Sequence, residues 1–215
     1  MLKIDIQLFG GRGSSSGDFS GGGGLSAGDI LETTSFVSER QNYDISDDVM
    51  GVFRDVNDEY GYVIGDIHVA KMESGVTALA YYDGANIGFN EKFANASSLN
   101  KIYDDSIKSG FHPNRGSKSP AEAVASHELG HALTDAVGQK MGGLDIDRAS
   151  SQILKEAKKK SGDSTMYGMA SKISGYAKHS KAEAIAEAFS DVYCNGSKAK
   201  KQSKAIVEVI DSYLK

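Results

Sequence analysis

Apolar residues recur at helical spacing in three separate stretches of the chain. In the first stretch, Val49, Val52, Val56 and Tyr60 follow the polar run 46–48, which we expect to cap the start of a helix. Three or four apolar residues in every two turns are typical of an amphipathic helix with one buried face. The same pattern predicts a helix at Ile146, Ala149, Ile153, Leu154 and Ala157, and a C-terminal helix at Ile206, Val209, Ile210, Tyr213 and Leu214.

Between residues 62 and 90 the apolar pattern changes to one typical of β-strands. The runs 62–69 and 77–82 are rich in β-branched, aromatic and other apolar residues, and Asp83-Gly84-Ala85-Asn86 predicts a turn into a third run at 87–90. Either 79–82 or 87–90 forms the edge of this small sheet, and the pattern does not choose between them. We therefore expect an α+β fold, with a small mixed sheet followed by a helical half.

The first 28 residues differ in composition from the rest of the chain. Apolar and polar residues alternate from Leu2 to Phe9, and a stretch rich in glycine and serine follows from Gly10 to Gly28. This pattern predicts an N-terminal hydrophobic anchor peptide at 1–9, a flexible linker at 10–28 and one folded domain at 29–215.

A further helix is predicted to begin at the capping box Ser119-Pro120-Ala121-Glu122, in which serine is the N-cap and proline is the first helical residue. Gly138 is expected to end this helix. Gly130 lies inside it, where glycine costs about 1 kcal/mol relative to alanine. The cost predicts a close neighbour at Gly130, such as the backbone of another element.

The same helix contains His127-Glu128-Leu129-Gly130-His131, which is the HExxH pattern of zinc peptidases. Residues four positions apart lie on one face of a helix, so both imidazoles can bind a single Zn²⁺ ion. Glu128 is then placed to take a proton from a water molecule in the open coordination position. HExxH also occurs by chance in unrelated proteins, so the pattern alone does not establish a zinc site. A catalytic zinc site has three protein ligands, so a third should come from a residue after His131.

The segment 180–192 offers three carboxylates at helical spacing on an otherwise apolar helix. In one register, Glu183 is the third ligand and Glu187, one turn later, orients a ligand histidine. In the other register, Glu187 is the ligand and Asp191 orients the histidine. A third interpretation places Glu183 outside the site, as the capping-box partner of Ser180.

The segments 127–132 and 174–189 together resemble the catalytic domain of anthrax toxin lethal factor and its relatives. In that family, a tyrosine stands seven residues before the glutamate that opens an ExxxEAF helix, and Tyr176 and Glu183 have this spacing. The resemblance implies a zincin-like metallopeptidase domain in which an extended substrate pairs with an edge strand above the active-site helix. The roles it implies are Zn²⁺ ligands at His127, His131 and Glu183, a general base at Glu128, a hydroxyl beside the metal at Tyr176 and an orienting carboxylate at Glu187.

The tyrosine spacing favours Glu183 as the third ligand. The segment 187–191 also resembles the ExxxD helix of thermolysin-like peptidases, which keeps the register with Glu187 and Asp191 open. A phenol at Tyr176 would stabilise the oxyanion that develops during attack on a peptide carbonyl. Its alternative role is that of an amphipathic core residue.

The opening segment resembles the N-termini of tailed-phage minor head and structural proteins, in which a hydrophobic peptide of the MLK type precedes a glycine-rich stretch. This resemblance implies a phage or prophage origin and contact of the N-terminal peptide with phage capsid or head proteins. The two resemblances together imply a zinc-dependent endopeptidase that acts on a peptide or protein substrate. The alternative is a virion structural or host-interaction protein with a non-catalytic zincin-like module.

Composition excludes several other classes of protein. No apolar run approaches the roughly 20 residues of a membrane-spanning helix, and the N-terminus lacks the pattern of a secretory signal. We therefore expect no membrane partner, and the phage resemblance implies a location in the virion or the host cytoplasm. The single cysteine, Cys194, excludes an internal disulfide framework. The lysines of the C-terminal third lack accompanying aromatic residues, so we expect solvated helix faces and no nucleic-acid partner.

Overall fold

The computed structural model describes residues 30–35, 43–61 and 63–215, and in this part of the chain four strands form one mixed sheet. The strand order is β1-β2-β4-β3. β2 is antiparallel to β1 and parallel to β4, and β4 is antiparallel to β3. The predicted anchor at 1–9 and linker at 10–28 lie outside the described residues. The strands are β1 (Ile30–Ser35), β2 (Ile67–Met72), β3 (Ala80–Tyr82) and β4 (Ile87–Asn90).

The topology decides which strand forms the edge of the sheet beside the helices. β4 lies between β2 and β3, so it is an interior strand, and β3 is the edge strand. β3 also packs against the long helix α3. Of the two runs that the sequence left open, 79–82 therefore provides the edge. β2 and β3 are shorter than the apolar runs that predicted them. β2 begins only at Ile67, and β3 contains only three residues.

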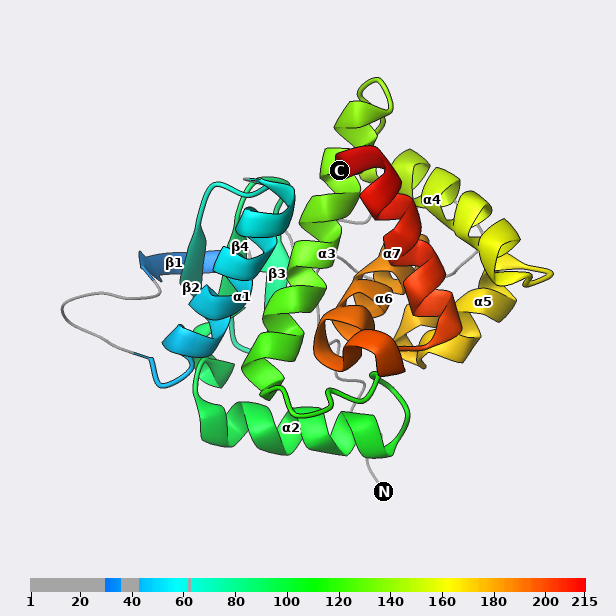
Figure 1. Ribbon diagram of the computed structural model, residues 1–215. Helices are drawn as coiled ribbons and strands as arrows, with labels where there is room; N and C mark the ends of the chain where they lie inside the picture. Colours follow the sequence, from blue (N-terminus) through cyan, green and yellow to red (C-terminus); the bar gives the residue numbers. More distant parts are fainter. Residues whose placement is uncertain (1–29, 36–42, 62) are drawn as a thin grey trace.

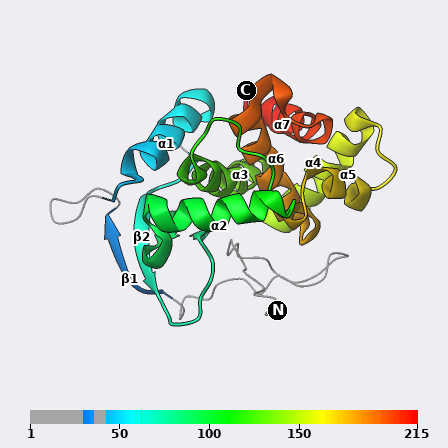
Figure 2. The same ribbon diagram turned by 90° about the horizontal axis from the view of Figure 1, so that it is seen from below.

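A helical half follows the sheet, which confirms the predicted α+β class (Figure 1). α3 runs through the middle of the molecule, with the sheet and α1 on one side and α6, α7 and α4 on the other. α2 crosses below α3, as the view from below shows (Figure 2). The helices are α1 (Ser46–Tyr60), α2 (Ala96–Lys108), α3 (Pro120–Lys140), α4 (Ile146–Ser161), α5 (Met166–Ile173), α6 (Lys181–Asn195) and α7 (Lys201–Leu214).

α3 begins as the sequence predicts and ends later than expected. The Ser119 hydroxyl accepts a hydrogen bond from the Glu122 N–H, and the Glu122 carboxylate accepts one from the Ser119 N–H, which completes the capping box. The prediction that Gly138 ends the helix was wrong, because α3 continues to Lys140. Gly138 instead makes room for the next loop, since a Cβ there would lie 2.4 Å from the carbonyl oxygen of Leu144.

The start of α1 also differs from the prediction. The helix begins at Ser46, but the N-cap is Ile45 and no side chain caps the first turn. The buried face is nevertheless the predicted one, because Val49, Val52 and Val56 are almost completely shielded from solvent. This difference arises because an apolar periodicity locates a buried face more reliably than it locates a helix end.

Gly130 explains how closely α3 and α6 approach each other. A Cβ at Gly130 would lie 2.8 Å from the Cα of Ala186 and 3.2 Å from the Cβ of Phe189. Only a residue without a side chain permits that approach, which confirms the predicted close neighbour. The consequence for the site is that side chains from the two helices meet at short range.

One cluster of buried side chains joins the sheet to the helical half, with Val69, Ile87 and Phe89 from the strands and Leu129 and Ile185 from α3 and α6. Within the described ranges, no helix has both the length and the hydrophobicity that crossing a bilayer requires.

Candidate metal centre

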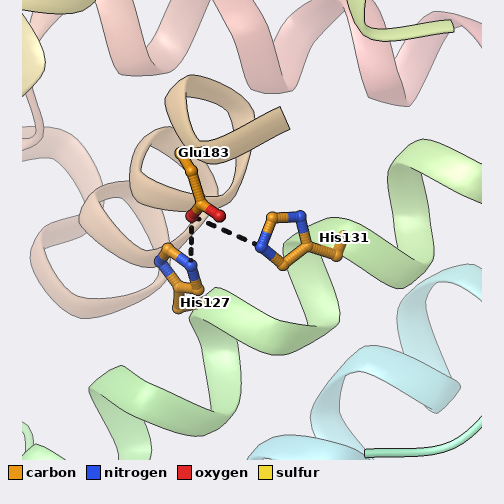
Figure 3. A group of neighbouring side chains, drawn as sticks. All are labelled: His127, His131 and Glu183. Carbon is orange, nitrogen blue, oxygen red and sulfur yellow. Dashed lines mark hydrogen bonds and ion pairs between the residues drawn. The ribbon is translucent and has the colours of Figure 1, made fainter. Parts of the chain in front are cut away.

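Two helices bring three metal-ligating side chains to one buried point. His127 and His131 are one turn apart on α3, and Glu183 lies in the first turn of α6. One ligand atom from each of the three lies within 4.8 Å of the other two. Figure 3 shows both imidazoles and the carboxylate directed toward one another. The two residues of α3 and the one of α6 are all buried.

The distances between these atoms fit a divalent metal ion. The Oε2 atom of Glu183 lies 3.0 Å from Nε2 of His127 and 3.5 Å from Nε2 of His131. Ligand atoms bound about 2.0–2.2 Å from a tetrahedral ion lie roughly 3.3–3.6 Å from one another. Two of the three separations are therefore already close to those that an ion between the atoms requires, and the remaining pair lies within 4.8 Å.

Unsatisfied polar atoms at the same point give a second test of the fit. Both carboxylate oxygens of Glu128 and both ring nitrogens of His131 are buried, and they make no hydrogen bond with any residue in the described part of the chain. A buried polar group without a partner costs about 1–3 kcal/mol, and a charged group costs more. A metal ion with a bound water would supply partners for Nε2 of His131 and for the Glu128 carboxylate, so the residues present fit a metal centre.

Glu183 and Glu128 differ in pKa because their neighbours differ. Burial alone would raise the pKa of Glu183, but the nearby charge of His131 and the hydrogen bond and charge of His127 hold it well below its ordinary value. Burial raises the pKa of Glu128 to about 7, although His127 and His131 partly oppose the rise. Glu183 is thus kept as an anionic ligand, while Glu128 can gain or lose a proton near neutral pH.

His127 lies between two carboxylates. Its Nε2 atom lies 3.0 Å from Oε2 of Glu183, and its Nδ1 atom lies 2.9 Å from Oε1 of Glu187. Burial opposes a charge on the ring, but the hydrogen bonds to Glu183 and Glu187 raise the pKa of His127 to about 10. A metal ion that binds at Nε2 therefore competes with a proton at that atom.

Glu187 lies on the opposite side of His127 from Glu183. Its Oε1 atom accepts hydrogen bonds from Nδ1 of His127 and Nδ1 of His112, both at 2.9 Å, and its Oε2 atom accepts one from the hydroxyl of Ser174 at 2.6 Å. Burial would raise the pKa of Glu187, but the charge and hydrogen bond of His112 and the contacts with His127 lower it to about 2. An ionised carboxylate only accepts hydrogen bonds, so Nδ1 of His127 carries a proton that it donates to Glu187, while Nε2 faces Glu183.

Asp191 serves another part of the fold. Its Oδ2 atom accepts a hydrogen bond from the Lys200 N–H at the start of α7, and its Oδ1 atom accepts one from the side chain of Asn195. These bonds hold the connection between α6 and α7. The geometry therefore places Asp191 in the helix connection, and it favours the register in which Glu183 is the candidate ligand and Glu187 contacts the histidine.

The Ser180 capping interaction and the metal-site role of Glu183 use different atoms. The Ser180 hydroxyl accepts a hydrogen bond from the Glu183 N–H at 3.0 Å. The Glu183 carboxylate is directed toward the histidines. The cap therefore fixes the first turn of α6 without engaging the side chain.

Tyr176 lies beside the histidines, in the short 3-10 helix Tyr176–Lys178 that precedes α6. Its side chain is buried, and its ring centroid lies 5.9 Å from that of His127. The ring also contacts Phe111, His112 and His179. The structure thus places Tyr176 next to His127, and its role beside the metal stays a prediction.

His112 is the residue of this site that the sequence did not reveal. It lies in the loop between α2 and α3, fifteen positions before His127, where no helical or strand spacing relates it to the HExxH pattern. Its side chain is completely buried and contacts Glu187. In the sequence, His112 stands out only because the His112-Pro113 pair comes shortly before α3. Its distance along the chain from His127 and His131 matches no known spacing of metal ligands.

Comparison with protein-family models, curated proteins and solved structures gave no match. The class of the protein therefore rests on its own fold and site. An α+β fold with a buried His-His-Glu donor set beside an unpartnered glutamate suggests a metal-dependent hydrolase. Several first-row divalent ions bind this combination of imidazole and carboxylate ligands.

Proposed function

We propose that the protein is a zinc-dependent endopeptidase in which His127, His131 and Glu183 hold the ion. The observation that carries this proposal is the buried His-His-Glu cluster with the Glu128 carboxylate next to it on α3. Three protein ligands with one open position are typical of catalytic zinc sites, whereas structural sites use four. When bound, zinc supplies Lewis-acid polarisation of a carbonyl and lowers the pKa of a water molecule to about 7.

Glu128 is the general base of the proposed reaction. Its carboxylate is buried and makes no hydrogen bond in the described part of the chain, so it is free to accept a proton from the attacking water. Its pKa near 7 lets it pass that proton on to the leaving amine. Tyr176, beside His127, donates a hydrogen bond to the oxyanion that develops on the scissile carbonyl.

The substrate in this proposal is an extended peptide that pairs with β3. This strand lies at the edge of the sheet and packs against α3, which carries the candidate ligands. A strand at the edge of a sheet can bind a peptide through main-chain hydrogen bonds. Phage or prophage origin, and contact of residues 1–9 with capsid or head proteins, remain proposals that rest on the N-terminal sequence resemblance.

A matched pair of glutamine variants on α3 tests the enzymatic proposal. Glu128→Gln keeps the shape of the side chain but removes the base, so we expect unchanged zinc stoichiometry and a 10²- to 10⁴-fold lower rate, which is the usual contribution of a general base. Glu122→Gln makes the same chemical change six residues earlier, where glutamine also completes a capping box, so its rate should equal that of the wild type. The measurements are metal content by elemental analysis and cleavage of a peptide library.

The outcomes distinguish the enzyme from its alternative. Zinc at one ion per chain, with cleavage that Glu128→Gln abolishes and Glu122→Gln retains, supports the endopeptidase. One zinc per chain without cleavage of any library member would favour a non-catalytic zincin-like module. A protein that binds no divalent ion would refute the metal centre itself.

A further inference from the structure

Glu187 is the point at which two buried histidines meet. Its Oε1 atom accepts hydrogen bonds from Nδ1 of His127 and Nδ1 of His112, and the side chains of His112 and Glu187 are at most 1% exposed. Water therefore cannot replace either donor. With Ser174 bound to Oε2, three protein donors fix the position of the carboxylate.

The ring of His112 is itself held on several sides. It stacks on Tyr103 with ring centroids 5.2 Å apart and an angle of 5° between the planes, and it makes edge contacts with Phe111 and Tyr176. Parallel stacking of this kind fixes the plane of the imidazole and therefore the direction of its Nδ1–H bond. His112 thus donates to Glu187 from a fixed position.

Backbone hydrogen bonds connect the loop that carries His112 to the segment Gly175-Tyr176. The N–H of Gly175 donates to the carbonyl of Gly110 at 2.9 Å, and the N–H of Tyr176 donates to the carbonyl of Phe111 at 2.8 Å. The loops approach closely, because a Cβ at Gly175 would lie 3.2 Å from both Gly110 O and Phe111 Cα. The position of His112 is therefore coupled to the position of Tyr176.

We infer that His112 is a positioning residue of the metal centre, which fixes Glu187 so that His127 presents Nε2 to the ion. This inference deepens the proposed function and rests on it. A hydrogen bond to the second nitrogen of a ligand histidine sets its tautomer and ring orientation. His112 extends that support by one further residue, from a loop that precedes α3.

Two substitutions separate the hydrogen bond of His112 from its ring packing. His112→Asn places an amide nitrogen where Nδ1 lies, so it keeps the donor to Glu187 and loses the stack on Tyr103. His112→Phe keeps an aromatic ring on Tyr103 and loses the donor. A residue that acts only through packing would tolerate phenylalanine better than asparagine.

The first measurement is Zn²⁺ affinity, obtained by competition with a chromophoric chelator. We expect His112→Asn to bind Zn²⁺ about as tightly as the wild type and His112→Phe to bind it about tenfold more weakly, the lower end of the range for the partners of ligand histidines. The second measurement is the ¹⁵N NMR signal of the His127 Nδ1–H group in the metal-free protein, which only His112→Phe should alter.

The inference is overturned if asparagine fails to preserve Zn²⁺ affinity, or if phenylalanine leaves both the affinity and the His127 signal unchanged. If His112→Phe does not fold, His112→Gln replaces it, because the longer side chain carries its amide past the Nδ1 position. A wild type that binds no Zn²⁺ would refute the proposed function, and the His127 signal would still decide the role of His112.

Discussion

Three glutamates lie within one small region and differ in their acid-base behaviour. Glu183 and Glu187 each contact two histidines, so their pKa values are lowered although both side chains are buried. Glu128 is equally buried but lacks a hydrogen-bonding partner in the described part of the chain, so its pKa rises to about 7. The surroundings therefore give the same residue type two roles. Glu183 and Glu187 stay anionic, whereas Glu128 can exchange a proton near neutral pH.

One of the other buried histidines, His68, lies in the sheet. His68 on β2, Gly88 on β4 and Tyr81 on β3 are register partners across three neighbouring strands. The Tyr81 ring lies over Gly88, where a Cβ would come within 2.2 Å of the ring, and its hydroxyl lies 2.8 Å from Nε2 of His68. Because Gly88 has no side chain, the side chains of His68 and Tyr81 can meet across it.

We expect His68 to make the fold less stable in acid. Burial lowers the pKa of His68, although Asp66 and Asp83 oppose the shift. The unfolded chain, with a histidine pKa of about 6.5, therefore takes up the proton first as the pH falls. The stabilisation is complete above about pH 6.5 and is lost as the pH drops toward the lower folded-state pKa.

The measurement is the free energy of unfolding in urea at about pH 7.5 and about pH 5, with chelator present throughout. His68→Gln retains an amide that can bond to the Tyr81 hydroxyl but cannot titrate. The wild type should lose more stability between the two pH values than His68→Gln does. Equal losses in the two proteins would contradict the prediction.

At the scale of the elements, the contact between α3 and α6 determines the site. The two candidate ligands on α3 and the one on α6 come together only because Gly130 lets the helices approach. Gly130→Ala must move one helix, since the nearest atom is the Cα of Ala186 and cannot rotate away. We expect a loss of about 1–3 kcal/mol in the free energy of unfolding, together with weaker Zn²⁺ binding.

Gly51 provides the matched control for Gly130. It lies inside α1, and a Cβ there would meet no atom within 4 Å. Gly51→Ala should therefore increase the free energy of unfolding by about 1 kcal/mol through helix propensity alone. Urea unfolding of the two variants checks the prediction, and a destabilised Gly51→Ala or a neutral Gly130→Ala would contradict it.

Elements specified by neighbouring residues could be predicted from the sequence, as the start of α3 shows. Its capping box lies within four residues, and the two histidines lie within one turn of each other. Glu183 required a longer inference, from its spacing to Tyr176. His112 and the actual partners of Asp191 could not be predicted, because their contacts join segments that no period relates.

The helices differ in the same way. α4 and α7 have regular apolar faces and were predicted, whereas α2 and α5 were not. α2 depends on Asn95, whose side chain accepts a hydrogen bond from the Ser98 N–H, and α5 depends on a similar bond from the Gly168 N–H to Thr165. α5 contains only eight residues, too few to show a clear apolar repeat. α2 does have an apolar face, which was not predicted from the sequence and is formed by Leu99, Ile102, Tyr103 and Ile107.

At the scale of the whole molecule, a bound ion would join α3 to α6 across the centre of the fold. Zinc that binds only the folded chain should stabilise it by about 2.7 kcal/mol at a hundredfold excess over Kd. That gain corresponds to a rise in Tm of roughly 5–10 °C for a domain of this size. A chelator should reverse the rise.

Two variants on α6 test whether the rise comes from this site. Glu183→Gln should lose most of the zinc-induced rise in Tm, because the anionic ligand is gone. Asp191→Asn should have a lower Tm than the wild type, since it weakens the bonds at the start of α7, but it should keep the full zinc-induced rise. Thermal unfolding with and without zinc measures both effects, and an unchanged rise in Glu183→Gln would exclude Glu183 as a ligand.

The brevity of β3 limits how a peptide could be recognised. Its three residues span only about 10 Å, and hydrogen bonding in an antiparallel pair involves every second residue on each side. Backbone pairing with this strand would therefore contribute at most about four bonds, too few to hold an arbitrary sequence tightly. Selectivity would then come from side-chain pockets on either side of the cleaved bond, which favours a narrow set of cleavage sites over general digestion.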